Sequence, residues 1–229
     1  MLAFSRKDAV LNRQIRERAE GKKVRRGPGR PKGKSRRHPH QKRPELKQRS
    51  ALHITLRASS RMPSLRSRKR FAVIKRAFVK FCGDKTTAFR LVHFAVLSNH
   101  VHFIVEADSK RALSLGMQKL LHSISRRLNA LNVAEAGGTL STHAGAYREQ
   151  LGWIGRAFSD RYHSHVLASS SEMSRAVHYV KHNAEQHYRS KRQGAADPFS
   201  SFAQSQTSLV APPQGFLLAR VCKEFLSTA

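Results

Sequence analysis

Cysteine is scarce in this 229-residue chain, which contains only Cys82 and Cys222. The two lie far apart, and neither belongs to a Cys-x-x-Cys pair. Two isolated cysteines argue against a disulfide scaffold and against a thiolate zinc site, and sparse cysteine fits a reducing compartment. We therefore expect a cytoplasmic protein.

Long apolar runs are also missing. No uninterrupted apolar stretch approaches the roughly 20 residues that a helix needs to span a bilayer. Residues 1–7 do not begin an apolar core of the length found in signal peptides. We expect neither a membrane-spanning segment nor a secretory signal.

Acidic residues are few, with 14 Asp and Glu against 44 Lys and Arg, and the formal net charge is +30. A charge of this sign and size indicates a polyanionic partner, and nucleic acid is the leading candidate. An anionic membrane surface is the alternative. The hydrophobic share of 39% still allows one core, and the length suits one sizeable domain with tails.

The basic residues are concentrated at the start of the chain, where residues 1–50 hold 18 Lys and Arg against four acids. Residues 21–50 consist mainly of Lys, Arg, Gly, Pro and His, which cannot bury enough apolar area to offset the entropy of ordering. We expect a disordered basic arm. Within it, residues 26–34 have a Gly-Arg-Pro centre around Arg30 that resembles an AT-hook, which lays arginine into a narrow A·T minor groove. A nonspecific solvated polycation is an equal alternative.

The rest of the chain alternates strand and helix patterns. Period-two alternation predicts strands near residues 52–57, 88–97, 101–106 and 158–168. Apolar stripes at spacings of three and four predict helices that end near residue 82 and that span 113–131 and 172–188. The order β-α-β-β-α-β-α predicts an α+β fold with a ferredoxin-like antiparallel sheet and helices packed on one face. We expect a folded domain at 51–190 with an insertion at 133–157, followed by a tail at 191–229 that ends in a short helix.

His100 and His102 stand on either side of Val101 in the third predicted strand. Alternate side chains of a strand point to the same face, so the two imidazoles lie side by side. Such a pair can chelate a divalent metal ion. Two satisfied polar residues on a half-exposed sheet are the alternative that the pattern alone leaves open.

Tyr179 and Asn183 lie four residues apart on the last predicted helix of the domain and therefore share one helical face. Two imidazoles and one amide oxygen would leave positions open on Mg²⁺ or Mn²⁺. The ion could polarise a phosphodiester while the tyrosine hydroxyl attacks phosphorus. Tyr162 and Tyr188 are rival nucleophiles, whereas no serine or cysteine motif supports another one.

Several arginines are candidates for phosphate contacts, although each alone could be a solvated charge. They are Arg30, Arg66, Arg68, Arg126, Arg127 and Arg161. His163 and His165 form a second His-x-His pair, for which we expect a structural role beside the metal strand.

Taken together, these motifs resemble those of the HUH single-tyrosine transposases, and the REP-associated tyrosine transposases in particular. The resemblance spans residues 51–190 and rests on Asn-His-Val-His at 99–102, Phe-Ser-Asp-Arg-Tyr-His at 158–163 and Tyr-x-x-x-Asn at 179–183. It implies that His100, His102 and Asn183 bind the metal ion and that Tyr179 is the nucleophile.

By the same resemblance, the protein would be a DNA transposase of a bacterial mobile element, located with the nucleoid. It would cleave and rejoin single-stranded hairpin ends through a 5′-phosphotyrosine intermediate, as a monomer or a homodimer. Many relatives have proline after the asparagine, whereas this chain has Ala184. A noncatalytic nucleic-acid-binding protein derived from a transposase is the alternative.

Overall fold

The computed structural model describes residues 45–82, 88–138, 157–188 and 196–227. The chain divides into two units, Met1–Arg37 and His38–Ala229, and every described residue belongs to the second. Residues 1–44 of the predicted arm, which include the AT-hook-like segment with Arg30, and most of the predicted insertion lie outside the described residues, whereas residues 45–50 are described. The boundaries predicted for these parts therefore stay predictions.

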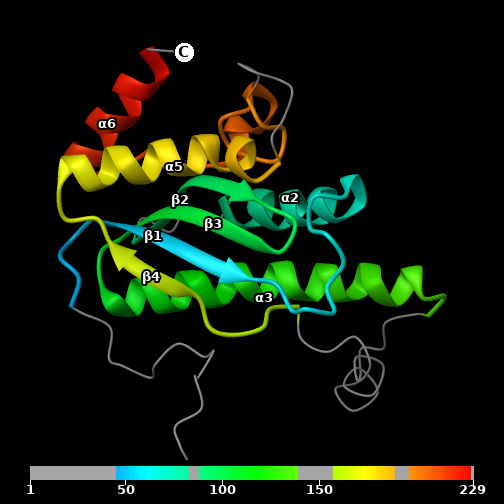
Figure 1. Ribbon diagram of the computed structural model, residues 1–229. Coiled ribbons are helices and arrows are strands. Elements are labelled where there is room, and N and C mark those ends of the chain that lie inside the picture. The colour runs from blue at the N-terminus through cyan, green and yellow to red at the C-terminus, as the bar shows by residue number, and fades with distance from the viewer. Residues whose placement is uncertain (1–44, 83–87, 139–156, 189–195, 228–229) are drawn as a thin grey trace, which may run out of the picture. The chain divides into compact units, whose positions relative to one another are not determined.

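Four strands form one antiparallel sheet, and the expected α+β fold is confirmed (Figure 1). The strands are β1 (Ser50–Arg57), β2 (Phe89–Val96), β3 (His100–Ala107) and β4 (His163–Val166). Their order in the sheet is β2-β3-β1-β4, so the first and third strands are the central pair, as expected for a ferredoxin-like sheet. Pairing of β1 with β3 places Thr55 opposite His102.

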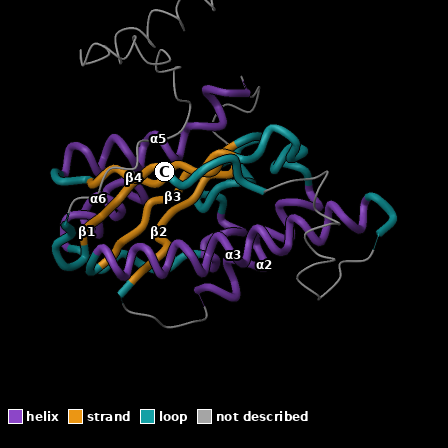
Figure 2. Tube along the Cα trace, turned by 90° about the horizontal axis from the view of Figure 1, so that it is seen from below, coloured by secondary structure: helices purple, strands orange, loops and turns teal. Residues whose placement is uncertain are grey.

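Two helices, α2 (Arg68–Cys82) and α3 (Lys110–Glu135), cover one face of the sheet (Figure 2). The alternation predicted for β1 turns Leu52, Ile54 and Leu56 toward these helices, where all three are buried. Phe78 of α2 belongs to the same core. This layer is the main hydrophobic core of the described chain.

The other face is covered by α5 (Ser170–Tyr188) and α6 (Phe216–Ser227). Ile104 of β3 packs there with Val177 and Val180 of α5. The expectation that all helices pack on one face is therefore wrong. The physical reason is that the second face carries apolar positions of its own, namely Ala51, Val92, Ala95 and Ile104, which α5 and α6 bury.

The segment after residue 195 is tied to the domain by two buried acidic contacts. Asp197 accepts two hydrogen bonds from Arg66 at 2.7 and 2.8 Å. Glu106 of β3 accepts hydrogen bonds from the backbone N–H groups of Gln214 and Gly215, just before α6. A short 3₁₀ helix, η1 (Gln204–Leu209), lies between these two anchors. None of the described helices has the length and apolar character that a bilayer span requires.

Candidate active site

The paired histidines lie on β3 and face α5. His102 is only 3% exposed, whereas His100, at the start of the strand, is half-buried. Their ring centroids are 4.8 Å apart. The sequence thus predicted correctly that the two imidazoles share one face, and the structure adds that this face is covered by a helix.

One ring nitrogen of His102 is engaged by the neighbouring strand. Its Nδ1 lies 3.1 Å from Nε2 of His53 and 3.3 Å from the hydroxyl of Thr55, both on β1. The rings of His53 and His102 stack with their centroids 5.1 Å apart. These contacts fix the orientation of the imidazole.

The other ring nitrogen of His102 has no such contact. Its Nε2 is buried and has no hydrogen-bond partner among the described residues. A buried nitrogen without a partner costs free energy. If Nδ1 of His102 donates its proton to His53, Nε2 carries a free lone pair, which is the arrangement of a metal-ligating histidine.

The electrostatics of the cluster keep its imidazoles neutral. Burial, together with the neighbouring histidines His53, His100 and His187, lowers the pKa of His102 to about 3. Burial and the histidines of β4 lower the pKa of His53 to about 4. The pKa of His100 is also lowered, first by burial. Neutral imidazole is the form that binds metal ions.

Tyr179 lies on α5 directly over the histidine cluster. Its ring meets the His102 ring edge-on at 5.2 Å between centroids, and it lies 5.8 Å from the ring of His53. The side chain is half-buried. The predicted nucleophile and the second predicted histidine ligand are therefore in contact.

Asn183 follows Tyr179 by one helical turn and is fully buried. Its Oδ1 and Nδ2 atoms both lack a hydrogen-bond partner within the described part of the chain. One turn further along α5, the ring of His187 lies 5.6 Å from that of His100. Because Tyr179 contacts His102 and His187 contacts His100, the amide between them lies over the histidine pair.

This donor set suits a divalent metal ion. The described residues contain no group of three His, Cys, Asp or Glu side chains arranged to hold one, so an amide has to complete any such site. His102 Nε2 and Asn183 Oδ1 are both buried and have no hydrogen-bond partner in the described ranges, and the ring of His100 lies beside that of His102. Two imidazoles and an amide oxygen are compatible with Mn²⁺ or Mg²⁺ and leave room for substrate oxygens.

Two features of this site were not predicted from the sequence. The first is His53, whose contact with His102 depends on the register of β1 against β3. The second feature is a pocket of about 370 Å³ beside Tyr179, whose lining includes His165 and Arg175. Arg175 lies one helical turn before Tyr179, and this spacing could have indicated from the sequence that the two side chains are neighbours.

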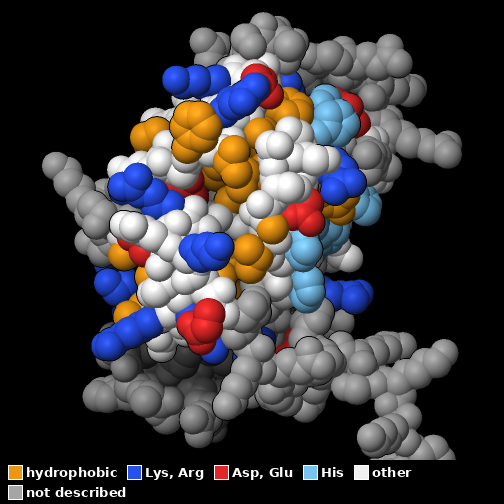
Figure 3. All heavy atoms as spheres, turned by 90° about the vertical axis from the view of Figure 1, so that its left-hand side faces the viewer, with side chains coloured by type: hydrophobic (Ala, Val, Ile, Leu, Met, Phe, Trp, Pro, Cys, Tyr) orange, Lys and Arg blue, Asp and Glu red, His pale blue; other side chains and the backbone are white. Residues whose placement is uncertain are grey.

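Figure 3 views the end of the molecule where α5 begins and shows histidine side chains gathered along one border. His163 and His165 lie on β4, which pairs with β1. Because β1 separates β4 from β3, the expectation that this pair lies beside the strand of His100 and His102 is wrong. Glu172, which also lines the pocket, accepts hydrogen bonds from the backbone N–H groups of Ala168 and Ser169. Its carboxylate therefore caps α5.

The rival nucleophile Tyr162 packs against the core on the α2 and α3 face of the sheet, which leaves it on the opposite side from the histidine pair. The side chain of Tyr188 lies outside the described residues. Among the tyrosines whose side chains the structure describes, Tyr179 is therefore the one that lies against the paired histidines.

The predicted arginines fall into different settings. Arg66 is bound by Asp197 and by the carbonyl oxygen of Val96, and its guanidinium lies over the ring of Phe199. These contacts compensate the charge of Arg66 and give it a structural role. We therefore do not retain Arg66 as a candidate DNA contact. Arg68 and Arg161 are exposed. Arg126 and Arg127 line a pocket between α2 and α3.

No family model matches the sequence, and no curated protein matches it. Among solved structures, the fold is similar to that of a REP-associated tyrosine transposase bound to a REP hairpin. The TM-score is 0.50 at 16% identity, over 72% of this chain and 83% of that one. A protein of Deinococcus radiodurans R1, provisionally described as a transposase, matches with a TM-score of 0.37 at 14% identity, over 63% and 95% of the two chains. At such identities, the first likeness establishes a transposase-like fold.

Proposed function

We propose that the protein is a metal-dependent DNA strand transferase of the single-tyrosine transposase kind. The observation that carries this proposal is that Tyr179 lies against two potential metal-binding atoms, His102 Nε2 and Asn183 Oδ1. Both atoms are buried and have no hydrogen-bond partner among the residues that the structure describes. A purely structural cluster would satisfy those atoms with hydrogen bonds. The fold shared with a tyrosine transposase supports the same conclusion.

In this proposal His100, His102 and Asn183 hold the metal ion, which when bound polarises the scissile phosphodiester. The hydroxyl of Tyr179 attacks phosphorus, so that a new P–O bond forms to the phenolic oxygen and the bond to the 3′ oxygen breaks. The phenol loses one proton and the leaving 3′ oxygen gains one. The product is a 5′-phosphotyrosine and a free 3′-OH, which can attack in turn to rejoin strands.

The pocket beside Tyr179 offers a place for the DNA backbone. Arg175 is exposed at its rim and shares the helical face of Tyr179, and His165 lines the wall on the β4 side. A guanidinium can hold a phosphate oxygen through two hydrogen bonds. Arg175 would thus position the phosphate that Tyr179 attacks.

The substrate in this proposal is single-stranded DNA at hairpin ends. The net charge of +30 favours a nucleic acid, and the transposase of similar fold was solved with a REP hairpin. The exposed Arg68 and Arg161 remain candidate backbone contacts.

The test is formation of a covalent adduct. Purified protein is incubated with labelled single-stranded hairpin DNA and Mn²⁺, and a denaturing gel separates protein-linked DNA from free DNA. We expect an adduct from the unmodified protein, none from Tyr179→Phe, and an undiminished adduct from the control Tyr162→Phe. Absence of any adduct across a broad hairpin pool, with salt-sensitive binding intact, would favour the noncatalytic nucleic-acid-binding protein instead.

A further inference from the structure

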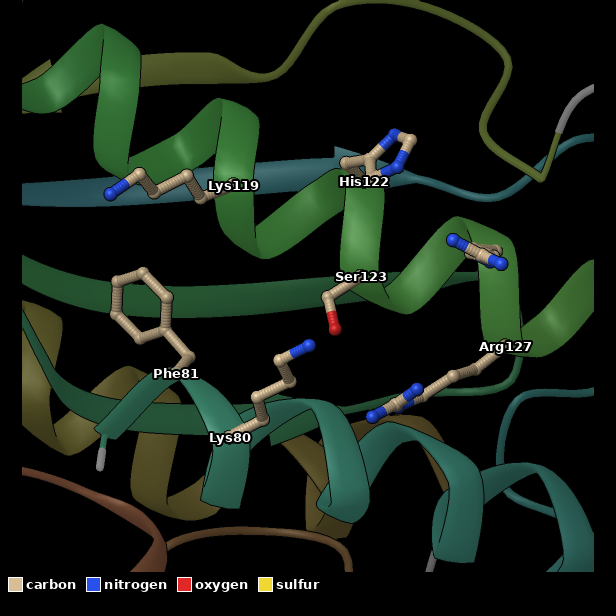
Figure 4. Close-up of a pocket in the computed structure, with 7 residues that line it drawn as sticks. Lys80, Phe81, Lys119, His122, Ser123 and Arg127 are labelled. Carbon is tan, nitrogen blue, oxygen red and sulfur yellow. The ribbon is translucent and has the colours of Figure 1, made fainter. Parts of the chain in front are cut away.

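A second pocket lies between α2 and α3, with a volume of about 590 Å³. Lys80 and Phe81 of α2 line one wall, and residues of α3 line the other. Figure 4 shows Lys80 reaching from α2 toward Ser123 of α3, while Arg127 extends into the same space. The pocket is thus built on two packed helices, which hold its walls in place.

The lining of this pocket is strongly basic. Lys80, Lys119, Arg126 and Arg127 contribute four cations, and no acidic side chain of the described residues lines it. Lys119, Ser123 and Arg127 recur at a spacing of four along α3, and Arg126 follows Ser123 by three, so these side chains lie on one side of that helix. Four like charges around one space repel each other, and an anion would relieve that repulsion.

Two details indicate a site prepared for a ligand. Nε of Arg127 is buried and lacks a hydrogen-bond partner in the described part of the chain. The ring of Phe81 packs edge-on against Phe89 at 5.4 Å, which fixes it as an apolar wall beside the cations. Cations next to an aromatic face match the phosphate and the sugar or base of a nucleotide unit.

The pocket and the candidate active site lie on opposite faces of the sheet. The helices α2 and α3 that line the pocket belong to the hydrophobic core on one face of the sheet. Tyr179 packs against the hydrophobic core on the other face. A ligand in this pocket therefore cannot be the phosphate that Tyr179 attacks.

We propose that the α2–α3 pocket is a noncatalytic site for the phosphate backbone of DNA, which contacts the protein on the face away from Tyr179. The inference rests on the proposed function in one respect, namely that DNA is the partner. A DNA molecule that reaches both faces must pass around an edge of the sheet, so the pocket would hold a part of the DNA outside the reacting strand.

Lysine footprinting tests the location of this site. The full chain is treated with an acetylating reagent with and without a saturating labelled DNA hairpin that carries single-stranded flanks, without added metal. Lys80 and Lys119 are both exposed, and we expect DNA to protect them, whereas the exposed Lys223 of α6 serves as the unprotected reference. Equal modification of Lys80 and Lys119 with and without DNA would overturn the proposal.

A matched pair of double variants tests the energetics. Lys80→Gln with Arg126→Gln removes two pocket charges, and Arg111→Gln with Lys223→Gln removes two exposed charges elsewhere. We expect the pocket variant to lower DNA affinity and to reduce the slope of log affinity against log salt by roughly 2, about 0.9 for each phosphate that is no longer neutralised. Identical affinity and slope in the two variants would contradict a specific site.

The adduct assay separates this inference from the proposed function. Protection of Lys80 and Lys119 without any Tyr179 adduct would retain the pocket and refute the strand transferase. An adduct without protection of these lysines would support the strand transferase and refute the pocket as a DNA site.

Discussion

The imidazole of His102 has two nitrogens in different situations. Nδ1 lies against His53 and Thr55, and Nε2 is buried with no hydrogen-bond partner among the described residues. Buried polar atoms are nearly always paired in stable proteins, and exceptions cluster at functional sites. The same argument applies to the amide of Asn183. Two such exceptions under one tyrosine are the strongest local sign of function in the described chain.

His53 should control metal affinity without being a ligand. His53→Ala removes the acceptor that fixes the Nδ1–H tautomer of His102, and loss of a partner of this kind typically costs about 10- to 100-fold in metal affinity. His53→Gln keeps an acceptor oxygen and should retain most of the affinity. Isothermal titration of Mn²⁺ into the DNA-free protein measures both variants.

The control for this experiment is Asn183→Ala, which removes a proposed ligand and should weaken Mn²⁺ binding more than either His53 variant. If His53→Ala bound Mn²⁺ as tightly as the unmodified protein, the contact between His53 and His102 would have no role in the metal site.

His93 should make the fold sensitive to acid. Burial lowers its pKa from 6.5 to about 4, and its ring stacks on Phe202 while its nitrogens lie near Ser201 and Cys222. Between these pH values the unfolded chain binds a proton that the folded chain does not. Stability contributed by this residue is therefore complete above pH 6.5 and falls, by about 1.4 kcal/mol per pH unit at most, as the pH drops toward 4.

Urea unfolding followed by circular dichroism at pH 7.5 and pH 5.5 measures this effect, with metal and DNA absent. His93→Gln cannot titrate and should lose less stability between the two pH values than the unmodified protein, whatever its stability at pH 7.5. Equal losses in both proteins would show that His93 does not carry the acid sensitivity.

At the scale of elements, α3 approaches the sheet closely because residue 116 is a glycine. A Cβ built at Gly116 would lie 2.2 Å from Cγ of the buried Phe89. Gly116→Ala should therefore destabilise the protein by about 1–3 kcal/mol through overpacking, although alanine is the better helix former. Thermal unfolding of the variant measures the change.

The matched control on the same helix is Ser114→Ala. Ser114 is exposed, so alanine there should leave stability unchanged or raise it by about 0.5 kcal/mol through helix propensity alone. A Gly116→Ala protein as stable as Ser114→Ala would mean that Phe89 moves aside without cost.

The contrast between β3 and α5 shows what the sequence could predict at this scale. The shared face of His100 and His102 follows from the two-residue period of a strand, and the shared face of Tyr179 and Asn183 follows from the helical repeat. Both are local properties. Contact between the two pairs is not local, because it depends on α5 crossing the face of the sheet opposite α2 and α3.

The features missed by sequence analysis have the same physical origin. His53 meets His102 only through the register of β1 against β3, and the pocket beside Tyr179 exists only because β4 brings His165 to the same space as Arg175. Arg66 was predicted as a phosphate contact for the same reason, because its ion-pair partner Asp197 lies far along the chain. Periodicity indicates faces of single elements, and tertiary packing decides which faces meet.

At the scale of the whole molecule, the net charge of +30 should dominate binding while contributing little to the chemical step. Each cation that neutralises a phosphate releases a counterion, so a protein with 6–10 such contacts loses roughly 10³–10⁵ in affinity between 50 and 200 mM salt. We expect a salt dependence of this order for the full chain on a labelled DNA hairpin, measured by fluorescence anisotropy.

Tyr179→Phe should follow the same salt dependence, because the substitution removes the nucleophilic hydroxyl and no positive charge. The two proteins would then bind DNA alike and differ only in adduct formation. A shallow dependence in both would mean that the basic residues do not meet phosphates, whereas a steep dependence that disappears in Tyr179→Phe would mean that the tyrosine holds DNA rather than attacking it. If both proteins show equally steep salt dependence and only the unmodified protein forms an adduct, then the basic surface captures DNA and the site around Tyr179 breaks the bond.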